Sequence, residues 1–195
     1  YLVRDNGTVI VTGSIDLTGT KLPELPRFGM RMELHQPYEN LTYYGRGPFE
    51  NYIDRYSGAF IGRYEDKVEN QFYWYIRPQE TGNKTDVRWL TLLDSGGLGV
   101  KITGLQPISF SALHFSPEDL DPGLTRKLQH TIDIVPQKNI FLHVDLKQRG
   151  LGGDNSWGMY PHNEYRLLDK KYTYSYMIEL VEKGSDKNDY LNSRK

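Results

Sequence analysis

The sequence contains no cysteine among its 195 residues. This absence excludes disulfides, thiolate metal sites and cysteine nucleophiles together. No apolar run approaches the roughly 20 residues that span a bilayer, which predicts a soluble protein without a membrane partner. The 24 basic and 25 acidic residues leave a net charge of −1, so no overall field attracts nucleic acid or an anionic membrane surface.

Helical periodicity is also scarce. Apolar positions follow a helical period over no more than about two turns, and the one short helix expected covers residues 116–120, where a serine cap precedes a proline. Strand patterns instead recur at the spacing of a large antiparallel sandwich. We therefore predict an all-β domain over residues 1–183, followed by a polar tail over residues 184–195.

The expected strands follow from alternating apolar residues and turn signals. Asn6 and Gly7 predict an opening hairpin between residues 1–4 and 8–12. Further strands are expected at 28–34, 41–45, 86–93, 98–104, 108–115, 132–135, 140–148 and 171–181. In the last of these, alternate residues place Tyr172, Tyr174, Tyr176 and Ile178 on one face. Residues 59–74 lose regular alternation and are expected to form a loop with short strands. Because the chain opens inside a strand pattern, we expect a piece of a larger protein whose location, cytoplasmic or periplasmic, the sequence does not decide.

Residues 150–158, with the sequence GLGGDNSWG, form the most unusual stretch. Four glycines in nine positions free the backbone to turn tightly, at an entropic cost that a packed strand has no need to bear. Asp154, Asn155 and Ser156 can hydrogen-bond their own backbone and so order the loop without a hydrophobic core beneath it. We expect the loop to present Trp157 at a fixed angle with one face of the indole free.

A flat aromatic face rimmed by short polar side chains suits a sugar ring. The C–H groups of a sugar stack on an indole, and its hydroxyls can bond to Asp154, Asn155 and Ser156. Together with Trp157, these residues are the predicted substrate-binding set. The alternative is that Trp157 covers the core from a surface loop, since tryptophans are buried on average.

A second dense stretch, residues 43–55, is charged and surrounds a Gly-Pro pair. Arginine forks bind carboxylates in pairs, so we predict a mutually paired, partly buried network of Arg46, Glu50, Asn51, Asp54 and Arg55. The alternative makes Glu50 and Asp54 the acid and base of a glycosidase. That chemistry requires a carboxyl group of raised pKa, which two nearby arginines disfavour.

The other polar residues match no metal-binding motif. The five histidines have no ligand spacing such as HExxH, and no metal site is predicted. Glu80 lies in a polar loop that precedes Arg88 and Trp89. It is a candidate acid only if this loop lines a cleft.

Three motifs together resemble the C-terminal domain of the large, multidomain β-galactosidases of glycoside hydrolase family two. They are YGRGPxENYxDR at 44–55, PQExG at 78–82 followed by Arg88 and Trp89, and GxGGDxSW at 150–157. The motifs occur in the family's order, and the similarity extends from Pro26 to Val181, which is most of the chain.

The resemblance implies a supersandwich of two large antiparallel sheets, related to the galactose-mutarotase fold and lacking its first strands here. It also implies that the catalytic glutamates and the magnesium and sodium sites lie on a TIM barrel outside this chain, which then carries no catalytic residue and no cofactor. Trp157 matches the tryptophan that reaches the barrel's mouth and stacks on the aglycone side of a β-galactoside. The implied partners are the other domains of the same polypeptide and a homo-oligomer of the full enzyme.

Two other functions stay open. One is an independent sugar-binding or aldose-epimerase-like module that uses its own concave sheet, and the other is a scaffold for subunit contacts. The exposure of Trp157 distinguishes these two functions from that of an accessory domain of a β-galactosidase. Only the accessory domain requires an exposed loop tryptophan whose opposite pocket wall lies outside the chain.

Overall fold

Antiparallel strands make up almost all of the regular structure. The computed structural model describes residues 1–35, 37–121, 123 and 129–182, so the predicted tail at 184–195 lies outside the described residues. The strands are β1 (Leu2–Val3), β2 (Val9–Asp16), β3 (Arg27–Leu34), β4 (Asn40–Gly47), β5 (Phe60–Lys67), β6 (Lys84–Leu93), β7 (Gly99–Leu113), β8 (Ile140–Gln148) and β9 (Lys171–Val181). Short helical turns are η1 (Val68–Asn70), α1 (Pro117–Leu120), η3 (Thr131–Asp133) and η4 (Asn163–Tyr165). The prediction of an all-β fold is confirmed, and no helix in the described ranges is long and apolar enough to cross a membrane.

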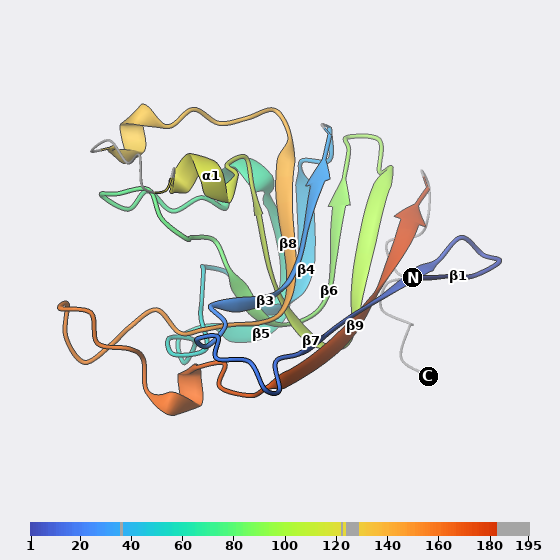
Figure 1. Ribbon diagram of the computed structural model, residues 1–195. Helices are drawn as coiled ribbons and strands as arrows, with labels where there is room; N and C mark the ends of the chain where they lie inside the picture. The colour runs from blue at the N-terminus through green and yellow to red at the C-terminus, as the bar shows by residue number, and fades with distance from the viewer. Residues whose placement is uncertain (36, 122, 124–128, 183–195) are drawn as a thin grey trace.

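The strands form one antiparallel sheet that folds back over itself (Figure 1). The main row runs β1-β2-β9-β7-β6-β4-β5, and β8 and β3 branch from β7. The long strand β7 makes this branch, because its residues 99–104 pair with β9 whereas its residues 109–113 pair with β8. Pro107 lies between the two halves, where the missing N–H breaks no ladder hydrogen bond. The branch and the main row become the two layers of a β-sandwich.

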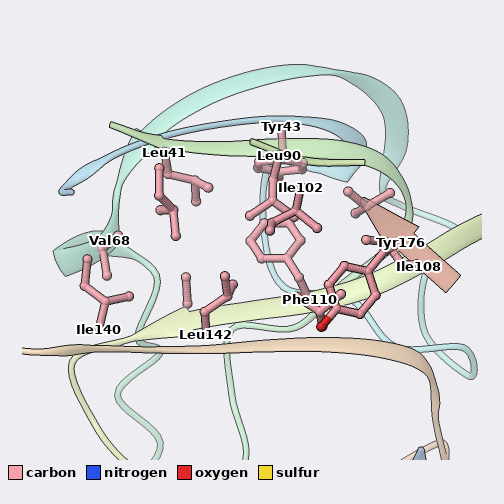
Figure 2. Packing of buried hydrophobic residues seen from close by; sticks show 14 of the residues in the cluster. Leu41, Tyr43, Val68, Leu90, Ile102, Ile108, Phe110, Ile140, Leu142 and Tyr176 are labelled. Atoms are coloured by element: carbon pink, nitrogen blue, oxygen red, sulfur yellow. The ribbon is translucent and has the colours of Figure 1, made fainter. Parts of the chain in front are cut away.

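The hydrophobic core lies between these layers. In Figure 2, Leu41, Tyr43 and Leu90 of the main row point toward Ile140 and Leu142 of β8, and all five side chains are at most 1 % exposed. Strand geometry explains the pattern, because alternate residues face opposite sides of a sheet. In β9 this alternation buries the three tyrosines predicted to share one face, Tyr172, Tyr174 and Tyr176.

Two local predictions are confirmed by turn and cap geometry. The opening hairpin turns at Gly7, whose φ is +82°, and the Arg4 N–H donates to the Thr8 carbonyl at 2.9 Å. The helix α1 begins with a capping box, in which the Ser116 hydroxyl accepts from the Asp119 N–H and the Asp119 carboxylate accepts from the Ser116 N–H. Such reciprocal bonds satisfy the free donors of the first helical turn.

Three strand predictions were wrong. Residues 60–67, within the stretch expected to be a loop with short strands, form the regular strand β5, an edge strand whose side chains face solvent almost throughout. Residues 98–104 and 108–115, expected as two strands, are for the most part in strand, but they form the single strand β7 (Gly99–Leu113) without the expected break. Residues 132–135, expected as a strand, contain the turn η3, and Ile132 there is 88 % exposed. An apolar run such as residues 132–135 forms a strand only where a neighbouring strand offers backbone hydrogen-bond partners.

Candidate functional site

The glycine-rich loop leaves the sandwich between β8 and β9 and projects at the lower left of Figure 1. Trp157 near its tip is 91 % exposed. The Asn155 Oδ1 accepts a hydrogen bond from the Trp157 N–H at 2.8 Å, which is the local Asx bond expected from the sequence. The exposure of Trp157 agrees with the prediction that the indole is open to solvent and contradicts the alternative that it covers the core.

The three polar residues beside Trp157 lie on the same exposed tip. Asp154 Oδ1 accepts from His162 Nε2 at 2.8 Å, and this hydrogen bond raises the pKa of the His162 imidazole. Ser156 faces solvent. Asp154 and Asn155 therefore bond within the loop, and their contact with sugar hydroxyls, like that of Ser156, stays a prediction.

A buried carboxylate holds together the two ends of the longer connection 149–166, which contains the glycine-rich loop. Glu24, whose side chain is 8 % exposed, accepts from Arg149 Nη1 at 3.1 Å and from Arg166 Nε at 2.7 Å. Burial opposes the ionisation of Glu24, but the two arginines outweigh it and lower the pKa of the carboxyl group. Both guanidinium groups also lie over the ring of Tyr160, at 5.5 and 4.8 Å. Sequence analysis missed Glu24, because no local pattern relates it to a loop that begins 125 residues later.

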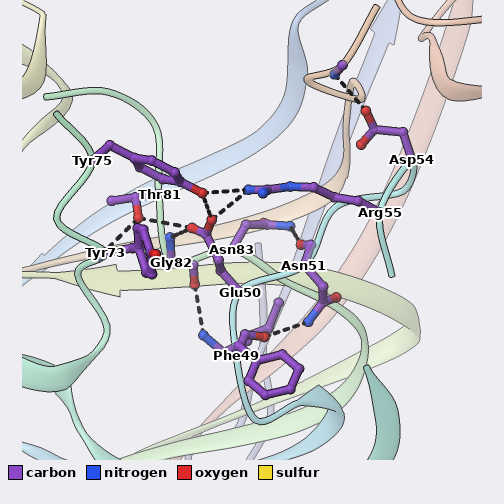
Figure 3. A network of polar contacts seen from close by, with 12 residues as sticks. Phe49, Glu50, Asn51, Asp54, Arg55, Tyr73, Tyr75, Thr81, Gly82 and Asn83 are labelled. Atoms are coloured by element: carbon purple, nitrogen blue, oxygen red, sulfur yellow. Dashed lines mark hydrogen bonds and ion pairs between the residues drawn. The ribbon is translucent and has the colours of Figure 1, made fainter. Parts of the chain in front are cut away.

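The charged segment contains a tightly bonded carboxylate, Glu50, whose side chain is 9 % exposed (Figure 3). Its Oε1 accepts from Arg55 Nη2 at 2.6 Å and from the Tyr75 hydroxyl. Its Oε2 accepts from the Thr81 hydroxyl at 3.0 Å and from the Gly82 N–H at 2.7 Å. Burial opposes ionisation, but these bonds and the Arg55 charge prevail and lower the pKa of Glu50. The predicted pairing of Glu50 with Arg55 is confirmed.

The predicted single network is wrong for Arg46 and Asp54. Arg46 Nε donates to Asp86 Oδ2 at 2.5 Å, and Asp54 Oδ2 accepts from the N–H of Gly152 at 2.7 Å. The sheet brings Asp86 next to Arg46, although the two residues are 40 positions apart. Arg46 therefore pairs with Asp86 and not with the carboxylates of its own segment.

Asn51 is 1 % exposed and bonds both within its own segment and to the strand β6. Its Oδ1 accepts from the Thr85 N–H at 2.9 Å, and its Nδ2 donates to the carbonyls of Arg46 and Phe49 at 3.1 and 3.0 Å. These bonds fasten the charged segment to the start of β6. Asn51 therefore stabilises the segment, as its place in the predicted structural set requires.

The candidate acid Glu80 lies against an arginine. Its Oε2 accepts from Arg27 Nη1 at 3.1 Å, and Arg27 also binds Asp145, whose side chain is 2 % exposed. Burial raises the pKa of Glu80, while the Arg27 charge opposes that shift. Arg27 thus connects β3, β8 and the loop before β6.

The described part of the chain contains no group of three or more histidine, aspartate or glutamate side chains that could hold a metal ion. What the loop does offer is an exposed aromatic ring, because Trp157 is 91 % exposed. An indole face of this kind can stack on a sugar or another flat ligand.

The fold and the site together define a β-sandwich domain with one anchored, exposed aromatic loop. The model of the family described as "Beta galactosidase small chain" matches residues 1–178. The chain belongs to this family, so the family resemblance predicted from its three motifs is confirmed.

Similar relatives are β-galactosidases from several bacteria. The chain is 36 % identical to the enzyme of Priestia megaterium over 180 residues, 36 % to that of Streptococcus thermophilus over 181 residues, and 34 % to that of Halalkalibacterium halodurans over 170 residues. These matches cover 92, 92 and 86 % of this chain but only 17, 17 and 16 % of the respective relatives. The chain therefore spans a small part of the length of the relatives that it matches.

Proposed function

We propose that the chain is an accessory domain of a β-galactosidase that hydrolyses terminal β-galactosides, and that Trp157 completes the aglycone side of the active site. The observation that carries this proposal is the 91 % exposure of Trp157 on an anchored loop. The similar β-galactosidases are more than five times as long as this chain, since the matched residues cover 16 to 17 % of their length. The other wall of the pocket, with the expected catalytic barrel, then lies outside this chain.

The backbone of the loop is held by hydrogen bonds although the Trp157 side chain is 91 % exposed among the described residues. Asn155 holds the Trp157 backbone, and Glu24 clamps Arg149 and Arg166 at the loop's two ends. Ordering an aromatic side chain before it meets a ligand reduces the entropy lost on binding. An ordered, unburied tryptophan is what a stacking surface for a sugar requires.

In this proposal the chain supplies no catalytic carboxylate, and the magnesium and sodium ions of the enzyme belong to the barrel. A retaining glycosidase needs two carboxyl groups about 5 to 5.5 Å apart, one with a raised pKa. Glu50 accepts four hydrogen bonds and its pKa is lowered. Glu80 has a raised pKa, but Arg27 holds it in a bridge to Asp145. Both carboxylates fit structural roles better than catalysis.

The test compares two inhibitors of the assembled enzyme, a glucose-like acceptor and a galactose analogue, for the wild type and Trp157→Ala. If a sugar hides roughly 60 Å² of the indole, stacking is worth about 1.5 kcal/mol, or about tenfold in affinity. We expect Trp157→Ala to weaken the acceptor about tenfold and to leave the galactose analogue almost unchanged. Phe60→Ala, which removes an aromatic ring 74 % exposed on β5, is the control and should change neither. Equal losses for both inhibitors, or none for either, would contradict the proposal.

An independent sugar-binding or epimerase-like module predicts a different result for the 195-residue chain alone. It requires galactose binding, or turnover of a galactoside, without any further domain. We expect neither, because about 1.5 kcal/mol of stacking does not offset the cost of ordering a free monosaccharide. Turnover of a chromogenic galactoside that Glu50→Gln or Glu80→Gln abolishes would favour the independent module.

A further inference from the structure

The charged segment and the glycine-rich loop meet at one hydrogen bond. Asp54 Oδ2 accepts from the Gly152 N–H at 2.7 Å, although the two residues are 98 positions apart. Figure 3 shows this bond at the upper right, on the far side of Arg55 from the Glu50 network. The loop that carries Trp157 is thus bonded directly to the segment that Glu50 and Asn51 hold in place.

Asp54 itself lies in a constrained turn. The Arg55 N–H donates to the Tyr52 carbonyl at 2.8 Å, which closes the turn around Asp54. Tyr52 is 1 % exposed, and the Arg55 guanidinium lies 4.8 Å from the centre of its ring. A carboxylate on such a turn has little freedom to follow a moving loop, so it can fix the loop's position.

The glycines on the loop allow this close approach. A Cβ atom at Gly150 would lie 2.7 Å from the carboxylate carbon of Asp54, and one at Gly152 would lie 3.4 Å from Oδ2. The first distance is shorter than real Cβ contacts allow. Gly150 therefore has a steric reason to be glycine that is specific to Asp54, beyond general loop flexibility.

We infer that Asp54 is a positioning residue for Trp157, because its carboxylate clasps the loop at Gly152 and sets the direction in which the indole projects. Glu24 holds the loop at Arg149 and Arg166, which are its two ends. The Asp154 and Asn155 bonds lie on the exposed tip and join the loop only to itself. The clasp at Gly152 ties the arm that leads to Trp157 to the sandwich. Its effect on substrate rests on the proposed function, whereas the clasp itself does not.

Amide hydrogen exchange over residues 150–158 tests the clasp without any substrate. We expect exchange to accelerate about tenfold in Asp54→Ala, the equivalent of one lost hydrogen bond, and to stay near wild type in Asp54→Asn, whose amide oxygen can accept the same N–H. The matched control is Asp94→Ala, which removes a carboxylate that accepts from the N–H groups of Gly96 and Leu98 at 2.7 and 2.9 Å in another turn. This control should leave exchange in the loop unchanged.

Gly150→Ala provides an independent variant. It keeps Asp54, but the added Cβ pushes the Asp54 carboxylate away from the loop. It should accelerate the same amides, so the test holds even if Asp54→Ala does not fold. Wild-type exchange over residues 150–158 in a folded Asp54→Ala protein, or in Gly150→Ala, would overturn the inference.

Acceptor inhibition of the assembled enzyme tests whether Asp54 acts through Trp157. We expect Asp54→Ala to weaken a glucose-like acceptor severalfold, and Asp54→Ala combined with Trp157→Ala to be no weaker than Trp157→Ala alone. Additive losses would overturn the positioning role. If Trp157→Ala alone has no effect, the proposed function fails, and the exchange measurement still decides whether Asp54 clasps the loop.

Discussion

The charged segment at residues 46–55 and the loop at residues 150–166 are both polar, glycine-containing and largely outside regular strands, yet they differ in what their polar groups bond. Glu50 and Asn51 are nearly buried, and besides bonds within their own segment they accept from the N–H groups of Gly82 and Thr85, which belong to another part of the chain. Asp154 and Asn155 are exposed and bond within their own loop. Regions of similar composition thus differ in role: the charged segment is fixed to the sandwich by buried bonds, whereas the loop exposes its side chains to solvent.

The difference has an energetic reason. Removing one partner from a buried, hydrogen-bonded charge leaves the other group without water or a replacement bond, which costs several kcal/mol. An exposed pair exchanges its bond for water at little cost. Four predictions use this contrast, beginning with the largest effect.

Glu50→Ala should lower the free energy of unfolding by about 3 to 5 kcal/mol, because it strips a buried network of the carboxylate that accepts four hydrogen bonds. Asp154→Ala, the matched change in the loop, should leave the midpoint of urea unfolding unchanged. Urea denaturation followed by circular dichroism measures both. Similar losses in the two variants would mean that burial does not separate the two regions.

Asn51→Ala and Asn155→Ala offer a pair of identical changes with a smaller expected contrast. Each asparagine accepts a backbone N–H, that of Thr85 at 2.9 Å for Asn51 and that of Trp157 at 2.8 Å for Asn155. We expect a loss of about 2 to 3 kcal/mol for the buried residue and less than about 1 kcal/mol for the exposed one. Thermal unfolding of both variants tests this order, and a larger loss for Asn155→Ala would reverse the comparison.

Acid should weaken the fold partly through Glu50. Its pKa in the folded protein lies below the ordinary value of 4.5, so its stabilising contribution is complete above that value and is lost as the pH falls through the lowered pKa. Glu50→Gln should therefore flatten the loss of stability between about pH 5 and pH 3. Asp145 and Glu80 act in the opposite direction, because burial raises their pKa values. An unchanged slope of unfolding midpoint against pH in Glu50→Gln would show that Glu50 does not contribute.

The smallest effect concerns the loop tip. The hydrogen bond to Asp154 raises the pKa of His162 above its ordinary value of 6.5, so the pair contributes to loop order below pH 6.5 and loses that contribution as the pH rises through the raised pKa. Asp154→Asn should move the His162 pKa back toward 6.5 in an NMR titration. A constant His162 pKa would show that the contact is not populated in solution.

Local chemistry was enough to predict much of the fold. The Asn6-Gly7 turn, the capping box at Ser116 and the tyrosine face of β9 depend on neighbours in the sequence, and each is present in the structure. The strand β5 escaped prediction because, as an edge strand exposed along most of its length, it carries little apolar alternation. Alternation marks only those strands that have one buried face.

The sequence by itself favoured an exposed Trp157, since a loop of glycines and short polar residues has little that is apolar to cover an indole. Only the tertiary structure decided which groups hold that loop. Asp54 bonds to Gly152, 98 residues away, and Glu24 bonds to Arg149, 125 residues away. Arg46 binds Asp86 rather than the carboxylates of its own segment. The reason is physical: the order and register of the strands, rather than distance along the chain, determine which charges and N–H groups come within hydrogen-bonding range.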